Sequence, residues 1–394
     1  MFAVSKRLRF KTIAAVYGLF VAGTLSGTVT SFAAFGSPAP AEKIASAAFK
    51  ATPVFKASDI IWGFDFISDS EIILALKSGE LLLVDAKTGK SQAVAGGPTV
   101  VARGQGGLLD VKVYRESGKT WIYLTASVTP DKGTASEKKS NQTTALFRGE
   151  WKSPKIENIT RIFEAEPSVD SSLHFGSRLA FPKSGGVFMT LGERNQRDRA
   201  QDLSQHWGKV VRLTLEGKPH PQNPYTQKSS VGNVTPKPEI YSWGHRNPQG
   251  IAIDPGTGDV YVSEHGPRGG DEVNLIKASA NYGWPTITYG REYWGPRIGK
   301  NSQPGLEQPV KYYVPSIAPS SLLIPSGKAP KELAGKFIQG ALVLQHVNIT
   351  DIKSGNETRL FEDMKKRFRH VAESPSGEIF LATDDGDLLK LERQ

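Results

Sequence analysis

The sequence contains no cysteine. Disulfide bonds, thiolate catalysis and cysteine-based zinc sites are therefore excluded. The sequence also lacks the His-x-x-x-His spacing of many zinc enzymes, the Gly-x-Ser-x-Gly elbow of many hydrolases and the Walker loop of nucleotide-binding proteins. No run of Lys and Arg interleaved with aromatic residues is present, which argues against a nucleic-acid partner. The common hydrolase, nucleotide-binding and nucleic-acid-binding classes thus lose support.

Long segments of helical periodicity are absent as well, and short apolar runs of alternating pattern take their place. Ile251 and Ile253 alternate with small or polar residues, a Pro-Gly-Thr-Gly turn follows, and Val260 and Val262 alternate again. This pattern predicts a hairpin with one buried face. The 40 glycines and 25 prolines suit a chain with many tight turns and argue against a helical protein.

The same unit of polar entry, strand, turn, second strand and polar exit recurs along the chain. Its second strands are predicted at Glu71–Leu76, Thr120–Ser127, Gly186–Gly192, Gly258–Glu264, Gly340–Leu344 and Gly377–Asp384. Six such repeats predict an all-β fold, a six-bladed β-propeller of four-stranded antiparallel sheets. A propeller places its blade entries on one face, so polar residues far apart in the sequence can build one site there.

The first residues differ from the rest. Four cations, Lys6, Arg7, Arg9 and Lys11, precede a stretch from residue 12 to residue 41 that carries no charge. We interpret residues 1–41 as an export signal peptide or an N-terminal membrane anchor, 42–57 as a poorly packed lead-in and 58–394 as the propeller domain. The protein is therefore expected outside the cytoplasm, in a bacterial periplasm or on the outer face of the cytoplasmic membrane. Any contact with a membrane is expected only through that anchor.

Loss of residues 1–41 lowers the formal charge from +10 to +6, so the remaining domain is still basic. A basic exported domain favours an anionic small ligand or a cell-surface polymer. The predicted blade entries and exits supply matching side chains, namely His174, Glu193, Asp110, Asp271, the pair Arg246 and Asn247, and the pair Arg367 and Arg369. Arginines from opposite blades suit a ligand with several carboxylates, and a neutral imidazole beside a carboxylate suits proton abstraction from a hydroxyl.

Each of these assignments has a structural alternative. His174 alone would be an ordinary core histidine, and Arg246 with Asn247 would only cap the entry to a strand. Asp271 and Glu272 would only bond amides of a Gly-rich turn. Arg367 and Arg369 would only continue a solvated charged face.

Several long motifs follow one another in the order HFGSRLAF, LGERNQRDRAQDLSQHWGKVVRL, GHRNPQGIAID, SEHGPRGGDEVNLI, NYGWP and PSIAPSS. Together they resemble the glucose/sorbosone dehydrogenase family, and within it most of all the soluble aldose sugar dehydrogenases. The resemblance spans nearly the whole chain after the lead-in. It implies a six-bladed propeller that uses pyrroloquinoline quinone (PQQ) and calcium to oxidise the anomeric hydroxyl of an aldose to a lactone. An unidentified electron acceptor would then reoxidise the cofactor.

The resemblance also implies roles for individual residues. His174 would be the base and Glu193 would orient it, while Arg246 and Asn247 would hold the quinone oxygen that gains charge. Further cofactor contacts would come from His265, Asp271, Arg367 and Arg369. Substrate contacts would come from Gln105 and Asp110. The carbonyls of Gly266 and Pro267 would bind the cofactor's calcium, and Glu272 with the Tyr282 carbonyl would bind a second, structural calcium.

Two positions depart from the family pattern. Leu76-Lys77 stands where the family usually has Glu-Arg, and Val343 stands where it usually has a cofactor-binding Lys, with Gln345, His346 and Asn348 as the nearest polar candidates. The loss of an ammonium beside an anionic quinone weakens binding. A propeller that binds a sugar or a cell-wall fragment without redox chemistry therefore remains an alternative. A calcium-dependent lactone hydrolase is a third possibility, although Glu193 and Asp271 supply few carboxylates for it.

Overall fold

The computed structural model describes residues 48–131, 140–227 and 230–394. The predicted signal or anchor at 1–41 and the first part of the lead-in lie outside the described residues, as does 132–139. Within the described residues, no helix combines the length and the apolar character needed to cross a bilayer.

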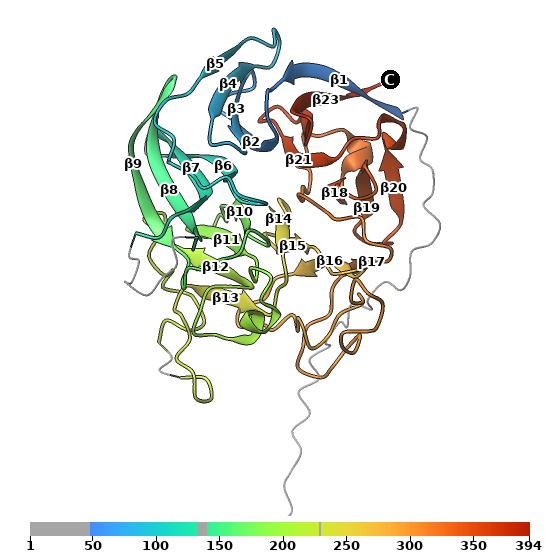
Figure 1. Cartoon of the computed structure of the whole chain (residues 1–394). Coiled ribbons are helices and arrows are strands. Elements are labelled where there is room, and N and C mark those ends of the chain that lie inside the picture. Colours follow the sequence, from blue (N-terminus) through green and yellow to red (C-terminus); the bar gives the residue numbers. More distant parts are fainter. Residues whose placement is uncertain (1–47, 132–139, 228–229) are drawn as a thin grey trace, which may run out of the picture. The chain divides into compact units, whose positions relative to one another are not determined.

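Six antiparallel sheets form the blades of a β-propeller, so the predicted fold class is confirmed (Figure 1). Blade one contains β2 (Ile61–Phe66), β3 (Glu71–Leu76), β4 (Leu81–Asp85) and β5 (Ser91–Ala93). Blade two contains β6 (Leu108–Glu116), β7 (Lys119–Val128), β8 (Thr143–Lys152) and β9 (Lys155–Glu164). Blade three contains β10 (Gly176–Ala180), β11 (Val187–Leu191), β12 (Lys209–Leu213) and β13 (Ile240–Trp243).

The remaining blades complete the ring. Blade four contains β14 (Pro248–Ile253), β15 (Val260–Glu264), β16 (Asp271–Leu275) and β17 (Lys311–Tyr313). Blade five contains β18 (Lys336–Ala341), β19 (His346–Asp351) and β20 (Glu357–Leu360). Blade six contains β21 (Phe368–Glu373), β22 (Ile379–Thr383), β23 (Asp387–Arg393) and β1 (Phe49–Lys56). Three short 3₁₀ helices are also described, η2 (Arg197–Gln201), η3 (Lys331–Leu333) and η4 (Glu362–Met364).

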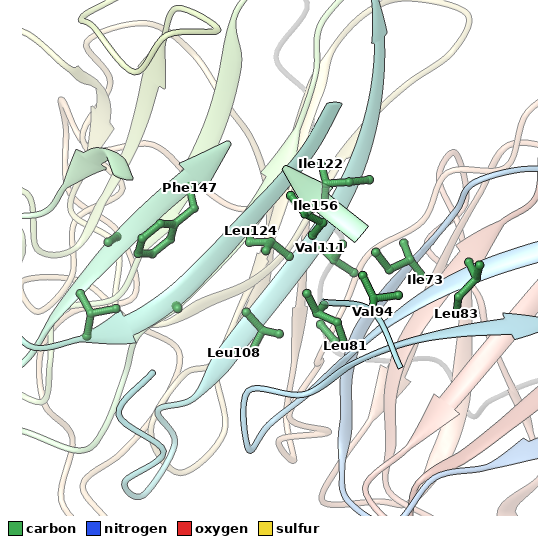
Figure 2. Packing of buried hydrophobic residues seen from close by; sticks show 14 residues of the cluster. Ile73, Leu81, Leu83, Val94, Leu108, Val111, Ile122, Leu124, Phe147 and Ile156 are labelled. Atoms are coloured by element: carbon green, nitrogen blue, oxygen red, sulfur yellow. The ribbon is translucent and has the colours of Figure 1, made fainter. Parts of the chain in front are cut away.

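The sheets are held together by apolar side chains from both faces of their strands. Strand β3 shows this, since Ile73 packs toward blade two while Ile72 packs with Phe380 of blade six. Successive strand residues point to opposite faces, so a run such as IILAL, residues 72–76, is apolar throughout when both faces are covered. Figure 2 shows one such layer, in which Ile73 and Leu81 of blade one meet Val111, Ile122 and Leu124 of blade two.

Part of the predicted lead-in is instead a strand. Residues Phe49–Lys56 form β1, which pairs antiparallel with β23 from Phe49 opposite Arg393 to Lys56 opposite Asp387. The first and last described strands thus share blade six, as the blue and red ribbons of Figure 1 show. This pairing closes the ring and leaves β1 as the outer strand of the sheet.

Blade five differs from the prediction in two ways. Its regular sheet has three strands, and the expected inner strand is reduced to isolated bridges, Pro319 to Ala341 and Leu323 to Ile338. Proline cannot donate to a ladder, so Pro315 and Pro319 account for this interruption. The predicted second strand Gly340–Leu344 ends at Ala341, because the amides of Leu342 and Val343 turn to the carbonyls of Ala318 and Ile317.

Candidate active site

One hairpin brings His174 and Glu193 together. His174 precedes β10, Glu193 follows β11, and the two strands are antiparallel neighbours. Imidazole Nδ1 lies 3.1 Å from Glu193 Oε1, and both side chains are buried. The structure thus brings into contact two residues predicted at a blade entry and a blade exit, and their catalytic roles stay predictions.

The backbone around this pair is tightly constrained. His174 has a φ of 50°, a left-handed conformation that only a few per cent of non-glycine residues adopt. A Cβ on Gly192 would lie 2.3 Å from the His174 carbonyl oxygen, so only glycine allows this approach. Gln105 Oε1 accepts a hydrogen bond from the His174 amide at 2.8 Å. The structure therefore shows Gln105 Oε1 supporting the His174 backbone, and the substrate contact of Gln105 stays a prediction.

The environment of His174 favours the neutral imidazole. Burial lowers its pKa below the ordinary value of 6.5, the Glu193 carboxylate raises it, and the Arg246 guanidinium lowers it again. Because Glu193 Oε1 is an acceptor, we assign the ring proton to Nδ1. This tautomer leaves Nε2 with a free lone pair. Glu193 Oε2 accepts from the Gln196 amide at 2.8 Å, so both carboxylate oxygens are used.

Arg246 lies beside this pair, in the wall of a pocket of about 560 Å³. Glu193, Pro267, Trp284 and Tyr293 line the same pocket. Arg246 Nη1 donates to the carbonyls of His265 at 3.0 Å and Gly266 at 2.7 Å. Its Nε is buried without a hydrogen-bond partner among the described residues. Asn247 is buried next to it, with Oδ1 accepting from Gln249.

The carboxylate of Asp271 binds amides of the protein itself and thereby fixes the loop between β15 and β16, residues 265–270. Asp271 is fully buried and accepts from the Gly266 amide with Oδ1 and from Ser316, Ile317 and Ala318 with Oδ2. Burial raises its pKa to about 6. Since four donors already occupy its oxygens, this geometry argues against the predicted cofactor contact and favours the structural alternative.

His265 is also committed to the fold. Its Nε2 lies 2.9 Å from the Pro319 carbonyl, to which it donates. Burial and the nearby Arg246 and Arg369 lower its pKa to about 3, so the ring is neutral. A cofactor contact remains open to it only through the ring face or Nδ1.

Glu272 faces a second carboxylate across the sheet. It pairs in register with Glu264 on β15, and the amide nitrogen of Asn274 donates to both, at 3.0 Å to Glu264 and 3.2 Å to Glu272. Burial and the charge of Glu264 raise the pKa of Glu272. The Asn274 Oδ1 atom is buried without a partner among the described residues. Carboxylate and amide oxygens are the ligands that a hard cation prefers, but both Glu264 oxygens already accept hydrogen bonds, from His245 Nδ1 at 2.8 Å and from the Arg246 amide at 2.7 Å.

Arg367 and Arg369 share one carboxylate that the sequence analysis did not identify, Asp384. Arg369 Nε and Nη2 donate to Asp384 at 2.6 and 2.9 Å, and Arg367 Nε donates to it at 2.7 Å. The Arg369 guanidinium also stacks over Trp62 at 4.2 Å. Asp384 ends the run GEIFLATD, so its position at the exit of a second strand was a signal that could have found it.

Asp110 lies in the central channel, away from the pocket that Arg246 lines. Its Oδ1 pairs with Arg178 Nη1 at 3.1 Å and its Oδ2 accepts from the Leu179 amide. Arg178 also donates to the carbonyls of Leu109, Gln249, Ser320 and Arg369, and so ties blade three to four other blades. Full burial and this pairing argue against the predicted substrate contact of Asp110.

The remaining predicted metal ligands are backbone carbonyls. Gly266 offers its carbonyl to Arg246 in this structure, and Pro267 lines the pocket. Tyr282 is buried, and its hydroxyl donates to the Leu275 carbonyl. Among the residues that the structure describes, no cluster of three or more His, Asp or Glu side chains is suited to a metal.

Comparison with known proteins adds to this geometry. The glucose/sorbosone dehydrogenase family model matches residues 58–390. The chain is 36% identical to an aldose sugar dehydrogenase of Escherichia coli over 344 residues, which cover 84% of this chain and 89% of the relative. It is 29% identical to quinoprotein glucose dehydrogenase B of Acinetobacter calcoaceticus over 255 residues, covering 59% of this chain and 50% of that protein.

A solved structure agrees with these sequence matches. The apo-form of the soluble aldose sugar dehydrogenase from Escherichia coli superposes with a TM-score of 0.81 at 33% identity. The match covers 88% of this chain and 100% of that chain.

Proposed function

The chain belongs to the glucose/sorbosone dehydrogenase family, and on that premise we propose that it is a sugar dehydrogenase that oxidises the anomeric hydroxyl of an aldose to a lactone with PQQ as cofactor. The observation that carries the proposal is the buried His174–Glu193 pair, whose Glu193 lines a pocket of about 560 Å³ together with Arg246. A relative whose name calls it a quinoprotein supports the choice of cofactor.

The proposed chemistry assigns the proton to His174. The anomeric hydroxyl gives its proton to Nε2, and the hydrogen on the same carbon leaves with its electron pair, so that the carbon–oxygen bond becomes the lactone carbonyl. PQQ, when bound, supplies the acceptor for that hydride. Glu193 holds Nδ1–H and stabilises the imidazolium that forms, and the Arg246 guanidinium offers a fixed positive charge in the pocket.

The residues present fit an anionic planar cofactor. Arg246 Nε, Trp62 Nε1 and Trp284 Nε1 are buried donors without a partner among the described residues, and an incoming ligand with several acceptors would satisfy them. Arg367 and Arg369, aligned by Asp384, would add positive charge. Val343 is 58% exposed and offers no ammonium. One missing charge-assisted contact is worth about 1.5 to 3 kcal/mol, so PQQ binding is expected to be weaker than in relatives that have the lysine.

The case for calcium differs between its two predicted positions. Glu272, with Glu264 and the orphan Asn274 oxygen beside it, fits a structural cation. At Gly266 and Pro267 the fit is poorer, because Arg246 already donates to the Gly266 carbonyl. A cation at Gly266 and Pro267 would lie against the Arg246 guanidinium. Binding there therefore requires the Arg246 side chain to move away from the Gly266 carbonyl.

Two other functions remain to be separated from this one. The first is a propeller that binds a sugar without redox chemistry. The observation that favours it is Val343, which stands where the family usually has a cofactor-binding lysine. A lactone hydrolase loses support, because Asp271, one of its two candidate carboxylates, is fully buried and hydrogen-bonded within its loop.

The proposed function is tested by reconstitution. Purified apoprotein is mixed with PQQ, calcium, an aldose and an artificial electron acceptor, and reduction of the acceptor is followed. Turnover that needs both PQQ and the aldose supports the proposal. Binding of the sugar without turnover would favour the non-redox alternative.

We propose that the folded domain lies outside the cytoplasm, because residues 1–41 have the charge pattern of an export signal or membrane anchor. Fractionation of the native host tests it, and full-length chain in the cytosol would contradict it.

A further inference from the structure

The long connection between β16 and β17 extends beyond its blade and carries an unusually exposed aromatic pair (Figure 1). Trp294 is 80% exposed and Tyr293 is 69% exposed, more than any other large hydrophobic side chain of the described residues. Both lie in a tight turn, in which the Glu292 amide donates to the Pro296 carbonyl and the Gly295 amide donates to the Glu292 carbonyl. We call residues 291–297 the aromatic tip.

Arginines stand at the base of the aromatic tip. Arg291 forms backbone bridges with Arg268 on one side and Arg297 on the other. None of these three side chains, nor that of the exposed Lys300, forms an ion pair with a carboxylate in the described part of the chain. The nearest acid in sequence, Glu292, is held by both Nη atoms of Arg197, at 2.7 and 3.2 Å. The tip therefore presents an uncompensated positive charge beside its aromatic rings.

The other exposed apolar side chains gather near the same site. Leu173 precedes His174, Val314 lies against Gly269, and Val343 follows Leu342, whose carbonyl accepts from Arg367. The remaining exposed large hydrophobic residue among those described, Val231, belongs to the connection between β12 and β13. An apolar rim thus adjoins the residues of the candidate site.

We propose that the aromatic tip docks the protein on an anionic phospholipid bilayer. Trp and Tyr prefer the headgroup level of a membrane, and nearby Lys and Arg are attracted to anionic headgroups. A stable protein partner normally needs an interface of about 1,000 Å² or more with well-packed pockets, whereas a projecting turn with two aromatic rings offers a small convex surface. The observations therefore favour lipid over an acidic protein.

Docking in this way would bring the pocket to the lipid surface. Tyr293 belongs both to the aromatic tip and to the pocket wall, where its hydroxyl lies 3.5 Å from Arg246 Nη2. The consequence, which rests on the proposed function, concerns the electron acceptor. A quinone dissolved in the bilayer would reach the reduced cofactor and take from it two electrons and two protons.

The test measures lipid binding without cofactor or sugar, so that its outcome does not depend on the dehydrogenase chemistry. The chain from Glu42 onward contains every strand of the closed ring and lacks the predicted anchor. It is mixed with vesicles of phosphatidylcholine alone, or of equal parts phosphatidylcholine and phosphatidylglycerol, and the bound fraction is measured by flotation. We expect binding to the anionic vesicles only, with loss at high salt.

Two double variants and two matched controls locate the contact. Removal of two arginine charges in Arg291→Gln/Arg297→Gln should weaken binding about 30-fold, since each basic residue near such a surface contributes about five-fold. Tyr293→Ser/Trp294→Ser should weaken it about ten-fold or more. Lys87→Gln/Lys90→Gln removes two exposed cations of blade one, and Val231→Ala removes the exposed apolar residue outside the rim. Both controls should bind as wild type does.

Circular dichroism and the melting temperature confirm that each variant is folded. Absence of vesicle binding at low salt would overturn the proposal, as would equal losses in the tip variants and the controls. Binding to an acidic protein surface such as polyglutamate, without binding to vesicles, would assign the tip to a protein partner. A raised sugar KM in Trp294→Ser with unchanged vesicle binding would assign it to substrate.

Discussion

Glu193 is the residue whose replacement tests the proposed catalytic pair most finely. Glu193→Gln keeps the size of the side chain and removes its charge. In the native protein both carboxylate oxygens accept, from His174 Nδ1–H at 3.1 Å and from the Gln196 amide at 2.8 Å. A glutamine amide has one acceptor oxygen, so it can serve only one of these two donors. The imidazole loses its negative neighbour in either case, and it also loses its orientation when the glutamine oxygen accepts from the Gln196 amide instead.

The size of the effect follows from that hydrogen bond. A hydrogen bond to a charged group is worth about 1.5 to 3 kcal/mol, and the imidazolium that forms during proton transfer gains most of it. We therefore expect kcat to fall about 10- to 150-fold, with the affinity for PQQ unchanged, because Glu193 is not among the proposed cofactor contacts. A role that is merely structural would instead lower stability and leave kcat per folded molecule unaltered.

The pH profile supplies an independent readout. His174 acts as a base only when neutral, and its pKa already lies below 6.5 because burial outweighs the opposing effect of Glu193. Removal of the carboxylate takes away the interaction that raises this pKa, so the acid limb of kcat/KM should move to lower pH. Rates are measured with enzyme loaded with PQQ and calcium. A wild-type kcat together with an unmoved acid limb would refute the pairing.

Four further outcomes are expected. His174→Ala should lower kcat by about 10²- to 10⁴-fold with little change in PQQ affinity, measured by titration and steady-state kinetics. Arg178→Met should cost about 3 to 5 kcal/mol in denaturant unfolding, because Asp110 is left as an unpaired buried charge. Asp271→Ala should cost at least about 3 kcal/mol, since it leaves buried loop donors unsatisfied. Calcium should raise the melting temperature of the wild type in the absence of PQQ, and that shift should vanish in Glu272→Gln.

The hairpin around His174 illustrates what sequence reasoning can reach. The alternating run predicted at Gly186–Gly192 corresponds to β11, and its antiparallel pairing with β10 places the entry residue His174 and the exit residue Glu193 at the same end. Such inferences depend only on neighbours in the chain. The same reasoning identified the second strands of blades one to four and of blade six, where turn residues flank each alternating run.

Other contacts could not be predicted because they join distant parts of the chain. The alternation in Phe49–Lys56 is weak, and its strand character comes from pairing with β23 at the other end. Arg178 reaches carbonyls of four other blades, which no local pattern indicates. The family resemblance implied that Asp271 contacts the cofactor, yet two of the amides that donate to it come from a segment more than forty residues later.

The most direct test of the central claim is a single turnover observed on the cofactor itself. Apoprotein is titrated with PQQ in the presence of calcium, and an aldose is then added without any other electron acceptor while the absorbance of the bound cofactor is followed. The proposed function predicts saturable PQQ binding and rapid reduction of the bound cofactor in the wild type, with reduction slowed by at least about 10²-fold in His174→Ala. PQQ that binds and stays oxidised when aldose is added, or equal reduction rates in the two proteins, would contradict it.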